Sequence, residues 1–369
     1  MRRLAALLVL AACDHAEPFR PPDPREPGPF RGALPRQLTF NRGTDRMPSW
    51  SSDGRYLLYS YEDLSRTVPD RCLGVLPAGG GSRVRSACQN LPGFADSLDA
   101  FEWPAERGGR VAYLVATSGA LDDAPSRRAL VVAPLADLLR TRRLVSFPYH
   151  SSTGRPHDLA LAVSWLDSTT ILYIGAVGAV VRPCLNCRSD TLFLGQDLVR
   201  LDLRTVPPTR EDIPGTYLAN SAAPAPDGRS VYYTVAGDSR VLRRDLVTGT
   251  VTEVHDFGLG RFARDVQVAG ERLVAVVGGR ISLTSDPLLG LLARDEGGQL
   301  VEVDLRAGAE RPLPLDQRFY RRPALSPDGR RLAVEAFPFT VTVIRDPAGN
   351  ILAADTAVAR AADLWLLEE

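Results

Sequence analysis

Lysine is absent from this chain of 369 residues, and all 44 of its basic residues are arginine. The chain therefore cannot form a lysine Schiff base, a phosphate-loop lysine contact or a lysine general base. Asp and Glu also total 44, so the formal net charge is zero. A neutral chain without a basic stripe argues against nucleic acid as a partner.

Motifs for catalysis and cofactor binding are missing as well. The sequence has no G-x-S-x-G nucleophile elbow, no H-E-x-x-H, no calcium loop and no glycine-rich phosphate loop. Histidine is scarce, and the four that occur are not at metal-finger spacing: His15, His150, His157 and His255. We therefore predict a protein that is not an enzyme and holds neither a cofactor nor a metal.

What the sequence has instead is a phrase repeated around a tight turn. Asp-Gly between two apolar runs is a strong hairpin signal, because Gly accepts the positive φ that the turn needs. The clear copies turn at Asp53-Gly54, Asp227-Gly228 and Asp328-Gly329, and fainter ones turn at Gly109, Ser168 and Gly270. The intervals of roughly 40–60 residues suit four-stranded propeller blades with loop insertions.

The two ends of the chain each lack a strand partner, which predicts that they meet. The last unit has its third strand at 363–367 and no sequence left for a fourth. A short strand at 36–40 precedes the first unit and has no partner of its own. We predict that this strand completes the last blade, since ring closure removes an exposed sheet edge. The result would be an all-β, six-bladed propeller over residues 36–369.

One copy of the phrase resembles a known family. Pro48-Ser49-Trp50-Ser51-Ser52-Asp53-Gly54-Arg55 is similar to the WD40-like repeat of TolB-type β-propellers, and the strand before it resembles the strand that precedes such repeats. The resemblance covers about 36–369. It implies a propeller of the bacterial cell envelope that docks an envelope protein or peptide.

The N-terminus is a targeting segment. Residues 1–12 combine two arginines with an apolar run that is too short to span a bilayer, as in a signal peptide. The end of this run, Leu10-Ala11-Ala12-Cys13, resembles the bacterial lipobox and implies lipidation of Cys13. A plain secretory signal with a chance cysteine is the alternative. Residues 13–35 are rich in proline and predict an extended tether, so we expect an exported, membrane-anchored protein in the periplasm or at the cell surface.

Four cysteines follow the tether, an even number for an exported protein. Cys72 and Cys88 are symmetric about Gly80, so a hairpin centred there would place them opposite each other and allow a disulfide. Cys184 and Cys187 lie in a long insertion of the third unit. A loop disulfide is the first interpretation of this pair, and a redox pair or half of a metal site are the alternatives.

Candidate binding residues lie just upstream of the first strand of each unit, and in propellers such residues face the axial channel or its mouth. They are polar and mix both charges: Arg46, Asp99, Asp158, Asn220, Arg264, Asp265, Arg321 and Arg322. Such a funnel suits a peptide or a carboxylate, unless these side chains bond one another. Insertions at about 115–128, 176–196, 282–298 and 338–361 offer a second surface. Trp50, Trp103 and Trp165 are interpreted as equivalent wedges between blades.

The leading hypothesis is a lipid-anchored, non-catalytic scaffold that binds a protein or peptide. The main alternative is an enzyme that uses the channel, or a propeller that binds a small ligand such as a sugar there, in either case with a metal. A structural subunit of a larger surface assembly is the third possibility.

Overall fold

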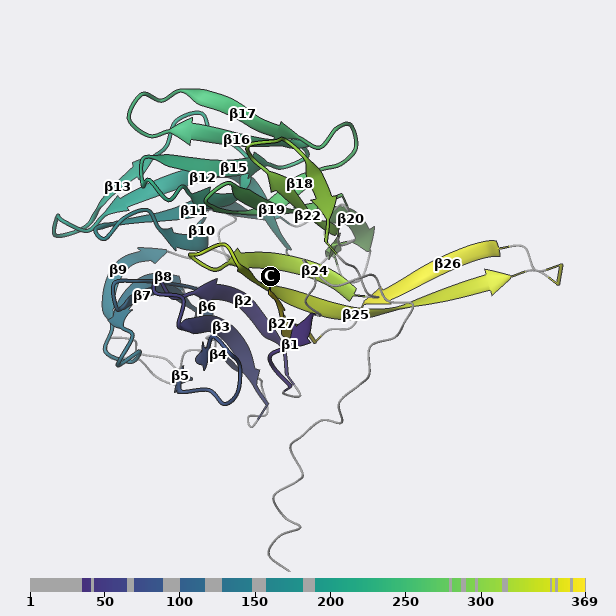
Figure 1. Ribbon diagram of the computed structural model, residues 1–369, viewed down its shortest axis with the longest axis horizontal. Helices are drawn as coiled ribbons and strands as arrows, with labels where there is room; N and C mark the ends of the chain where they lie inside the picture. Colours follow the sequence, from purple (N-terminus) through teal and green to yellow (C-terminus); the bar gives the residue numbers. More distant parts are fainter. Residues whose placement is uncertain are drawn as a thin grey trace, which may run out of the picture.

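The computed structural model describes residues 35–40, 43–64, 70–88, 100–116, 128–147, 157–181, 190–278, 281–286, 290–295, 298–313, 318–345, 347–348, 351–358 and 361–368. Strands and turns make up the elements of this part of the chain. It contains no helix with the length and apolar character needed to cross a membrane. The sheets follow one another around a common axis in chain order, from purple to yellow in Figure 1.

The first four blades are four-stranded antiparallel sheets whose strands follow chain order from the axis outward. Blade 1 contains β2 (Asp45–Trp50), β3 (Tyr56–Asp63), β4 (Asp70–Pro77) and β5 (Arg85–Ala87). Blade 2 contains β6 (Ala100–Arg107), β7 (Arg110–Ala116), β8 (Arg128–Pro134) and β9 (Arg142–Phe147). Blade 3 contains β10 (His157–Trp165), β11 (Thr170–Val181), β12 (Asp190–Asp202) and β13 (Thr209–Asp212). Blade 4 contains β14 (Ala219–Pro224), β15 (Ser230–Val235), β16 (Arg240–Asp245) and β17 (Val251–Asp256).

The last two blades carry added hairpins. Blade 5 contains β18 (Ala263–Ala269), β19 (Arg272–Val277), β22 (Gln299–Asp304) and β23 (Glu310–Pro312). The hairpin of β20 (Ile281–Asp286) and β21 (Gly290–Asp295) is inserted between its second and third strands. Blade 6 contains β24 (Arg318–Leu325), β25 (Arg331–Arg345), β27 (Asp363–Glu368) and β1 (Arg36–Gln37), and β26 (Ile351–Val358) pairs with the far half of β25.

Strand β1 closes the ring. It pairs antiparallel with β27, with Arg36 opposite Leu366 and Gln37 opposite Trp365. The contact continues past the strand, because the Leu38 N–H donates to the Leu364 carbonyl at 2.7 Å. The predicted fold class, an all-β six-bladed propeller closed by its two ends, is confirmed.

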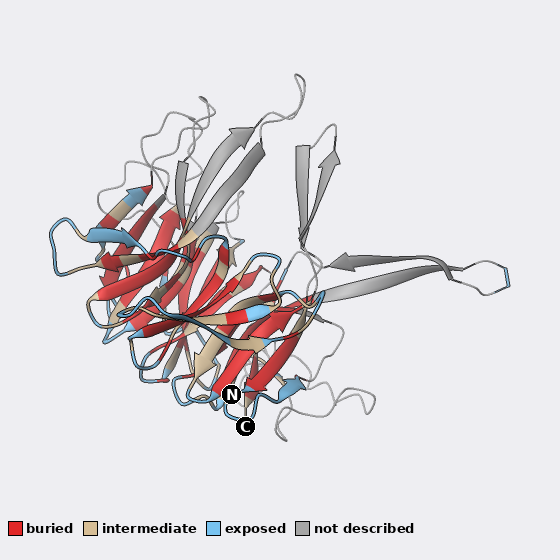
Figure 2. Ribbon diagram, turned by 90° about the horizontal axis from the view of Figure 1, so that it is seen from above, coloured by how far each residue is buried: buried red, intermediate tan, exposed pale blue. Residues whose placement is uncertain are grey.

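Strand direction gives the ring two distinct faces. The turns between first and second strands, and between third and fourth strands, lie on one face, which we name the turn face. The links from second to third strands, and from each fourth strand to the next blade, lie on the other, which we name the connection face. Because β1 runs as an outermost strand, the described chain enters it at Pro35 on the turn face. The start of β1 lies beside the end of β27 there, at the markers N and C of Figure 2.

The Asp-Gly turns form as the sequence predicts. Gly54, Gly228 and Gly329 have φ of +68°, +63° and +70°. In the first of these turns the Asp53 carboxylate accepts from the backbone N–H of Arg55 at 3.0 Å. The hydroxyl of Ser51, together with that N–H and the Arg55 guanidinium, lowers the pKa of Asp53 to about 2. The turn aspartates are thus occupied with local structure.

The hydrophobic core lies between neighbouring blades rather than in one central mass. One buried cluster joins Leu58 and Leu73 of blade 1 to Phe101 and Tyr113 of blade 2. Similar clusters join blade 2 to blade 3 and blade 4 to blade 5. Figure 2 shows these buried residues running through the sheets. No blade could bury this surface alone, so the packing of each depends on its neighbours.

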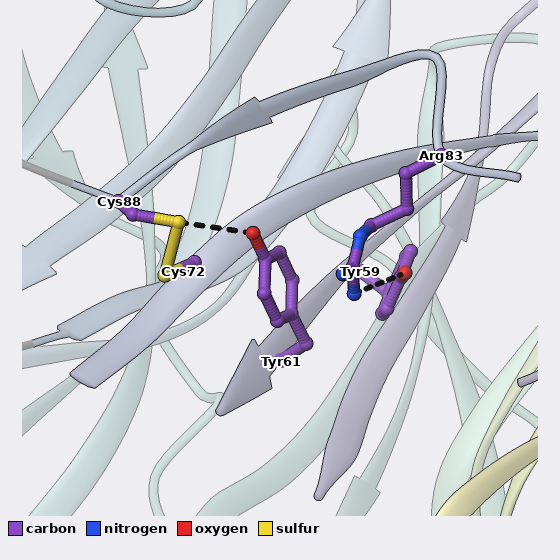
Figure 3. The surroundings of a disulfide bond; sticks show 5 residues. All are labelled: Tyr59, Tyr61, Cys72, Arg83 and Cys88. Atoms are coloured by element: carbon purple, nitrogen blue, oxygen red, sulfur yellow. Dashed lines mark hydrogen bonds between the residues drawn. A yellow bond between two sulfur atoms is a disulfide. The ribbon is translucent and has the colours of Figure 1, made fainter. Parts of the chain in front are cut away.

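A disulfide joins the outer strands of blade 1. Strand β4 pairs with β5, with Leu73 opposite Ala87, and the Cys72 and Cys88 Cα atoms that follow in this register lie 4.4 Å apart. Tyr61 covers the bond, with its hydroxyl 2.9 Å from the Cys88 sulfur, and Arg83 lies 4.0 Å from the centre of the Tyr61 ring (Figure 3). The hairpin centred near Gly80 places the two cysteines opposite each other.

Candidate binding site in the axial channel

The first strand of each blade carries a β-bulge near its middle. In five blades the bulge residue has a φ between +44° and +56°: Met47, Trp103, Ala162, Asp265 and Arg322. A positive φ is uncommon for a residue other than glycine. Its recurrence at one repeat position makes it part of the blade geometry, in which the bulge turns side chains toward the axis.

Each bulge frees backbone N–H groups, and side chains of the preceding blade accept several of them. The Asp265 carboxylate accepts from the Arg322 N–H at 3.1 Å, and the Ser221 hydroxyl accepts from the Val266 N–H at 3.1 Å. The Met47 N–H donates to Glu335 in the same manner. These bonds run from blade to blade around the channel and fix the first strands relative to one another.

The strongest electrostatic feature of the channel is the ion pair between Arg322 and Glu335. Glu335 is 0% exposed, and both of its carboxylate oxygens accept from the Arg322 Nη1, at 2.9 and 3.1 Å. Burial acts to lower the pKa of Arg322, but the carboxylates of Glu335 and Asp265 outweigh it and raise that pKa. The guanidinium also lies 4.8 Å from the centre of the Trp103 ring.

A cavity of about 670 Å³ extends from the bulges to the turn face and is lined by all six first strands. Trp50 and Trp165 stand in its wall between blades. Their indole N–H groups donate to the carbonyls of Ala324 at 2.8 Å and Ala105 at 2.9 Å, each on the preceding blade. The volume lies within the usual range for small-ligand pockets, roughly 300–1,000 Å³.

Trp103 is not equivalent to Trp50 and Trp165, and the prediction of three matching wedges is wrong. It is the bulge residue of β6, as Met47 is of β2, and each is followed by a proline. The half-buried indole therefore faces the channel, next to Arg322. The shared X-Pro dipeptide, which also occurs at Arg322-Pro323, is the sequence signal that could have located the bulge.

Seven of the predicted channel residues lie within described first strands rather than upstream of them, and the six whose side chains are described occupy two adjacent repeat positions. Arg46, Arg264 and Arg321 come directly before the bulge on blades 1, 5 and 6, which are neighbours in the ring. Bulge residues form the second group: Asn220, Asp265 and Arg322. Asp265 and Arg322 bond to each other, which the sequence left open as an alternative.

The connection-face end of the channel between blades 6 and 1 combines arginine with an aromatic ring. The guanidinium carbons of Arg46 and Arg321 lie 5.7 and 5.9 Å from the centre of the Phe337 ring. Nearby, Arg71 pairs with the buried Glu102 at 2.9 Å. Glu335 and Glu102 were not among the predicted residues.

Several predicted residues cannot be placed. Asp99, Cys13, Cys184 and Cys187 lie outside the described residues, and for Asp158 only the backbone in β10, opposite Val177, is described. Within the described residues, one group of three potential metal ligands occurs, Asp63, Cys72 and Cys88. Both sulfur atoms of that group belong to the disulfide.

The sheet order and the lining of the channel decide the architecture. The chain is a six-bladed β-propeller. No protein-family model and no curated protein matches its sequence. A protein assigned as TolB from Agrobacterium tumefaciens is 13% identical at a TM-score of 0.49, over 80% of this chain and 93% of that one.

Further propellers are similar to a comparable degree. TolB from Acinetobacter baumannii is 15% identical, with a TM-score of 0.42 over 86% of this chain and 81% of that one. A puromycin-hydrolysing peptidase from Mycobacterium tuberculosis is 15% identical, with a TM-score of 0.45 over 80% of this propeller and 42% of that protein. At such identities these likenesses concern the fold alone.

Proposed function

We propose that this propeller is a lipid-anchored, non-catalytic scaffold of the bacterial envelope, and that it binds a protein or peptide on its connection face. The observation that carries the proposal is the distribution of exposed side chains. Among the described residues, all three exposed aromatic residues and three of the four exposed leucines lie in the links that form this face: Phe40, Leu64, Tyr217, Leu218, Leu259 and Phe262. The turn face also exposes apolar residues, but these are four valines and one leucine: Val84, Leu139, Val206, Val247 and Val251. Aromatic residues are enriched at protein interfaces relative to the rest of the surface.

The loop from β17 to β18 is the clearest example. Leu259 is fully exposed between Gly258 and Gly260, whose φ values of +89° and +79° let the chain turn sharply on both sides of it. Phe262 follows in the same loop and is also exposed. An exposed apolar tip on a rigid blade supports docking, because ordering it against a partner costs little additional conformational entropy.

The position of the tether supports the same orientation. The described chain enters β1 at Pro35 on the turn face, whereas the apolar links belong to the connection face. An anchor that precedes Pro35 would attach the ring at the turn face. The connection face would then be free to meet a partner.

Photo-crosslinking in cells tests the docking proposal. A photoreactive residue at Leu259 is expected to crosslink the full chain to one envelope protein in stoichiometric amount. The matched control is Val247, which is 79% exposed but lies in a turn between third and fourth strands on the turn face. Equal crosslinking from both positions, or none from Leu259, would contradict the proposal.

Metabolic labelling tests the anchor. Radiolabelled palmitate is expected to label the wild-type chain, and the Cys13→Ser variant should lose the label completely. The variant should also move from the membrane fraction to the soluble fraction, since lipid chains on that residue would be its membrane attachment. Label retained by the variant would place the lipid elsewhere.

A second candidate function is small-ligand binding or catalysis in the channel cavity. The cavity volume of about 670 Å³ and its three tryptophans favour it. A ligand or metal that co-purifies with the protein, with no crosslinked partner, would support this alternative.

A further inference from the structure

Two buried polar groups meet on blade 1 at the connection-face end of the channel. Arg46 of β2 is directly opposite Ser60 of β3, so both side chains leave the same side of the sheet. The Arg46 Nε and the Ser60 hydroxyl are both buried and have no hydrogen-bond partner among the described residues. Ser60 is 1% exposed. A buried donor without a partner is costly, and such groups commonly mark a place for a ligand or an ordered water.

Two of the carboxylates near Arg46 are committed to other arginines. Glu335 is held by two bonds to Arg322, and Glu102 is held by Arg71. Burial lowers the pKa of Arg46, and the positive charges of Arg71 and Arg322 add to this effect, whereas Glu335 and, more weakly, Glu62 oppose it. The site therefore holds a desolvated cation whose Nε–H has no acceptor among the described residues, although Glu335 and Glu62 stabilise its charge.

The Phe337 ring and the exposed part of Arg46 limit how an anion would approach. The guanidinium carbon of Arg46 lies over the Phe337 ring, 5.7 Å from its centre. The Arg46 side chain is only half-buried, so part of it can be reached from the channel mouth. A planar guanidinium presents parallel donors that match the two oxygens of a carboxylate.

We propose that this site between blades 6 and 1 binds a carboxylate of an acidic peptide segment, with Arg46 as the main donor and the Ser60 hydroxyl as the second. The proposal rests on the proposed docking function and names the chemistry of the partner. A carboxylate fits better than a phosphate dianion, because the nearby Glu335 carboxylate repels the second negative charge more strongly.

Fluorescence anisotropy with the full chain provides the test. The probe is a labelled peptide of alternating glycine and glutamate, and its glutamine counterpart is the neutral control. We expect the glutamate peptide to bind at least about tenfold more tightly than the glutamine peptide. Arg46→Gln should remove this difference, and Ser60→Ala should reduce it about threefold.

Two controls separate recognition from folding. Arg46→Lys keeps the charge but not the planar fork, so it should retain only part of the preference. Arg55→Gln, at an exposed arginine of the turn face, should bind as the wild type does. The unfolding midpoint in urea, measured for each variant, shows whether the fold is intact.

Three results would overturn the proposal: no binding of the glutamate peptide, equal binding of both peptides, or tighter binding of inorganic phosphate than of acetate in competition. If Leu259 crosslinks to a partner as strongly in the Arg46→Gln background as in the wild type, docking stands and the carboxylate site fails. If no partner crosslinks while the glutamate peptide binds through Arg46, the docking function fails instead.

Discussion

Replacing Glu335 by alanine is expected to lower the free energy of unfolding by about 3–5 kcal/mol, because the change leaves a buried cation unpaired. Arg322 would keep its charge in the channel wall without the carboxylate that now accepts from it at 2.9 and 3.1 Å. The Met47 N–H would lose its acceptor on the neighbouring blade as well. Urea unfolding followed by circular dichroism measures the loss.

Three further variants isolate the cause. Glu211→Ala breaks an ion pair with Arg200 whose two side chains are largely solvated, and should cost less than about 1 kcal/mol. Glu335→Gln keeps an acceptor for Met47 and should fall between the two. The double variant Glu335→Ala with Arg322→Met should recover part of the loss, since no buried charge remains. A loss at Glu335→Ala no larger than at Glu211→Ala would show that the pair does not hold the ring together.

The turns and the Cys72–Cys88 pairing follow from signals that are local in sequence, and the ring closure follows from an unpaired strand at each end of the repeat. A turn needs only a residue that tolerates a positive φ, as Gly54 does. Two cysteines at equal distances from a hairpin turn meet whatever surrounds them. The closure was predictable because the last blade has only three strands from its own part of the chain and the strand at the other end has no partner. Pairing that strand with the last blade removes both exposed edges.

The channel was less predictable, because its contacts join segments far apart in the chain. Trp103 is six residues before its turn glycine, Gly109, and Trp50 is four residues before Gly54, so matching the two tryptophans by residue type assigned Trp103 to the wrong repeat position. Glu335 lies 288 residues from Met47, to which it bonds. A single carboxylate within the apolar run of β25 was the available signal, since an unpaired buried charge would be too costly to keep.

The closing strand and the inter-blade bonds in the channel wall both support the proposed docking function, because both keep the ring rigid. The bonds that cross blade boundaries at the bulges hold the first strands in register, and β1 prevents the ring from opening at blade 6. A ring fixed in this way keeps the connection-face links at constant separation, as a docking surface requires. The contribution of the closing strand to stability is therefore the second large effect to measure.

Leu38→Ala is expected to lower the free energy of unfolding by about 2–4 kcal/mol, a typical cost for a buried leucine. Leu38 is 5% exposed and packs in one cluster with Trp50 and Tyr59 of blade 1 and Leu364 and Leu366 of blade 6. Its side chain therefore bridges the first and last blades, beside its backbone bond to Leu364. Urea unfolding measures the change in midpoint at constant slope.

Phe40→Ala is the matched control, because it lies in the same segment two residues further on and is 55% exposed. It should change the free energy of unfolding by less than about 0.5 kcal/mol. Equal small effects at both positions would mean that the segment after β1 adds little to closure. A large effect at Leu38 alone shows that a few buried contacts at the joined ends stabilise all six blades, since each blade depends on its neighbours for burial.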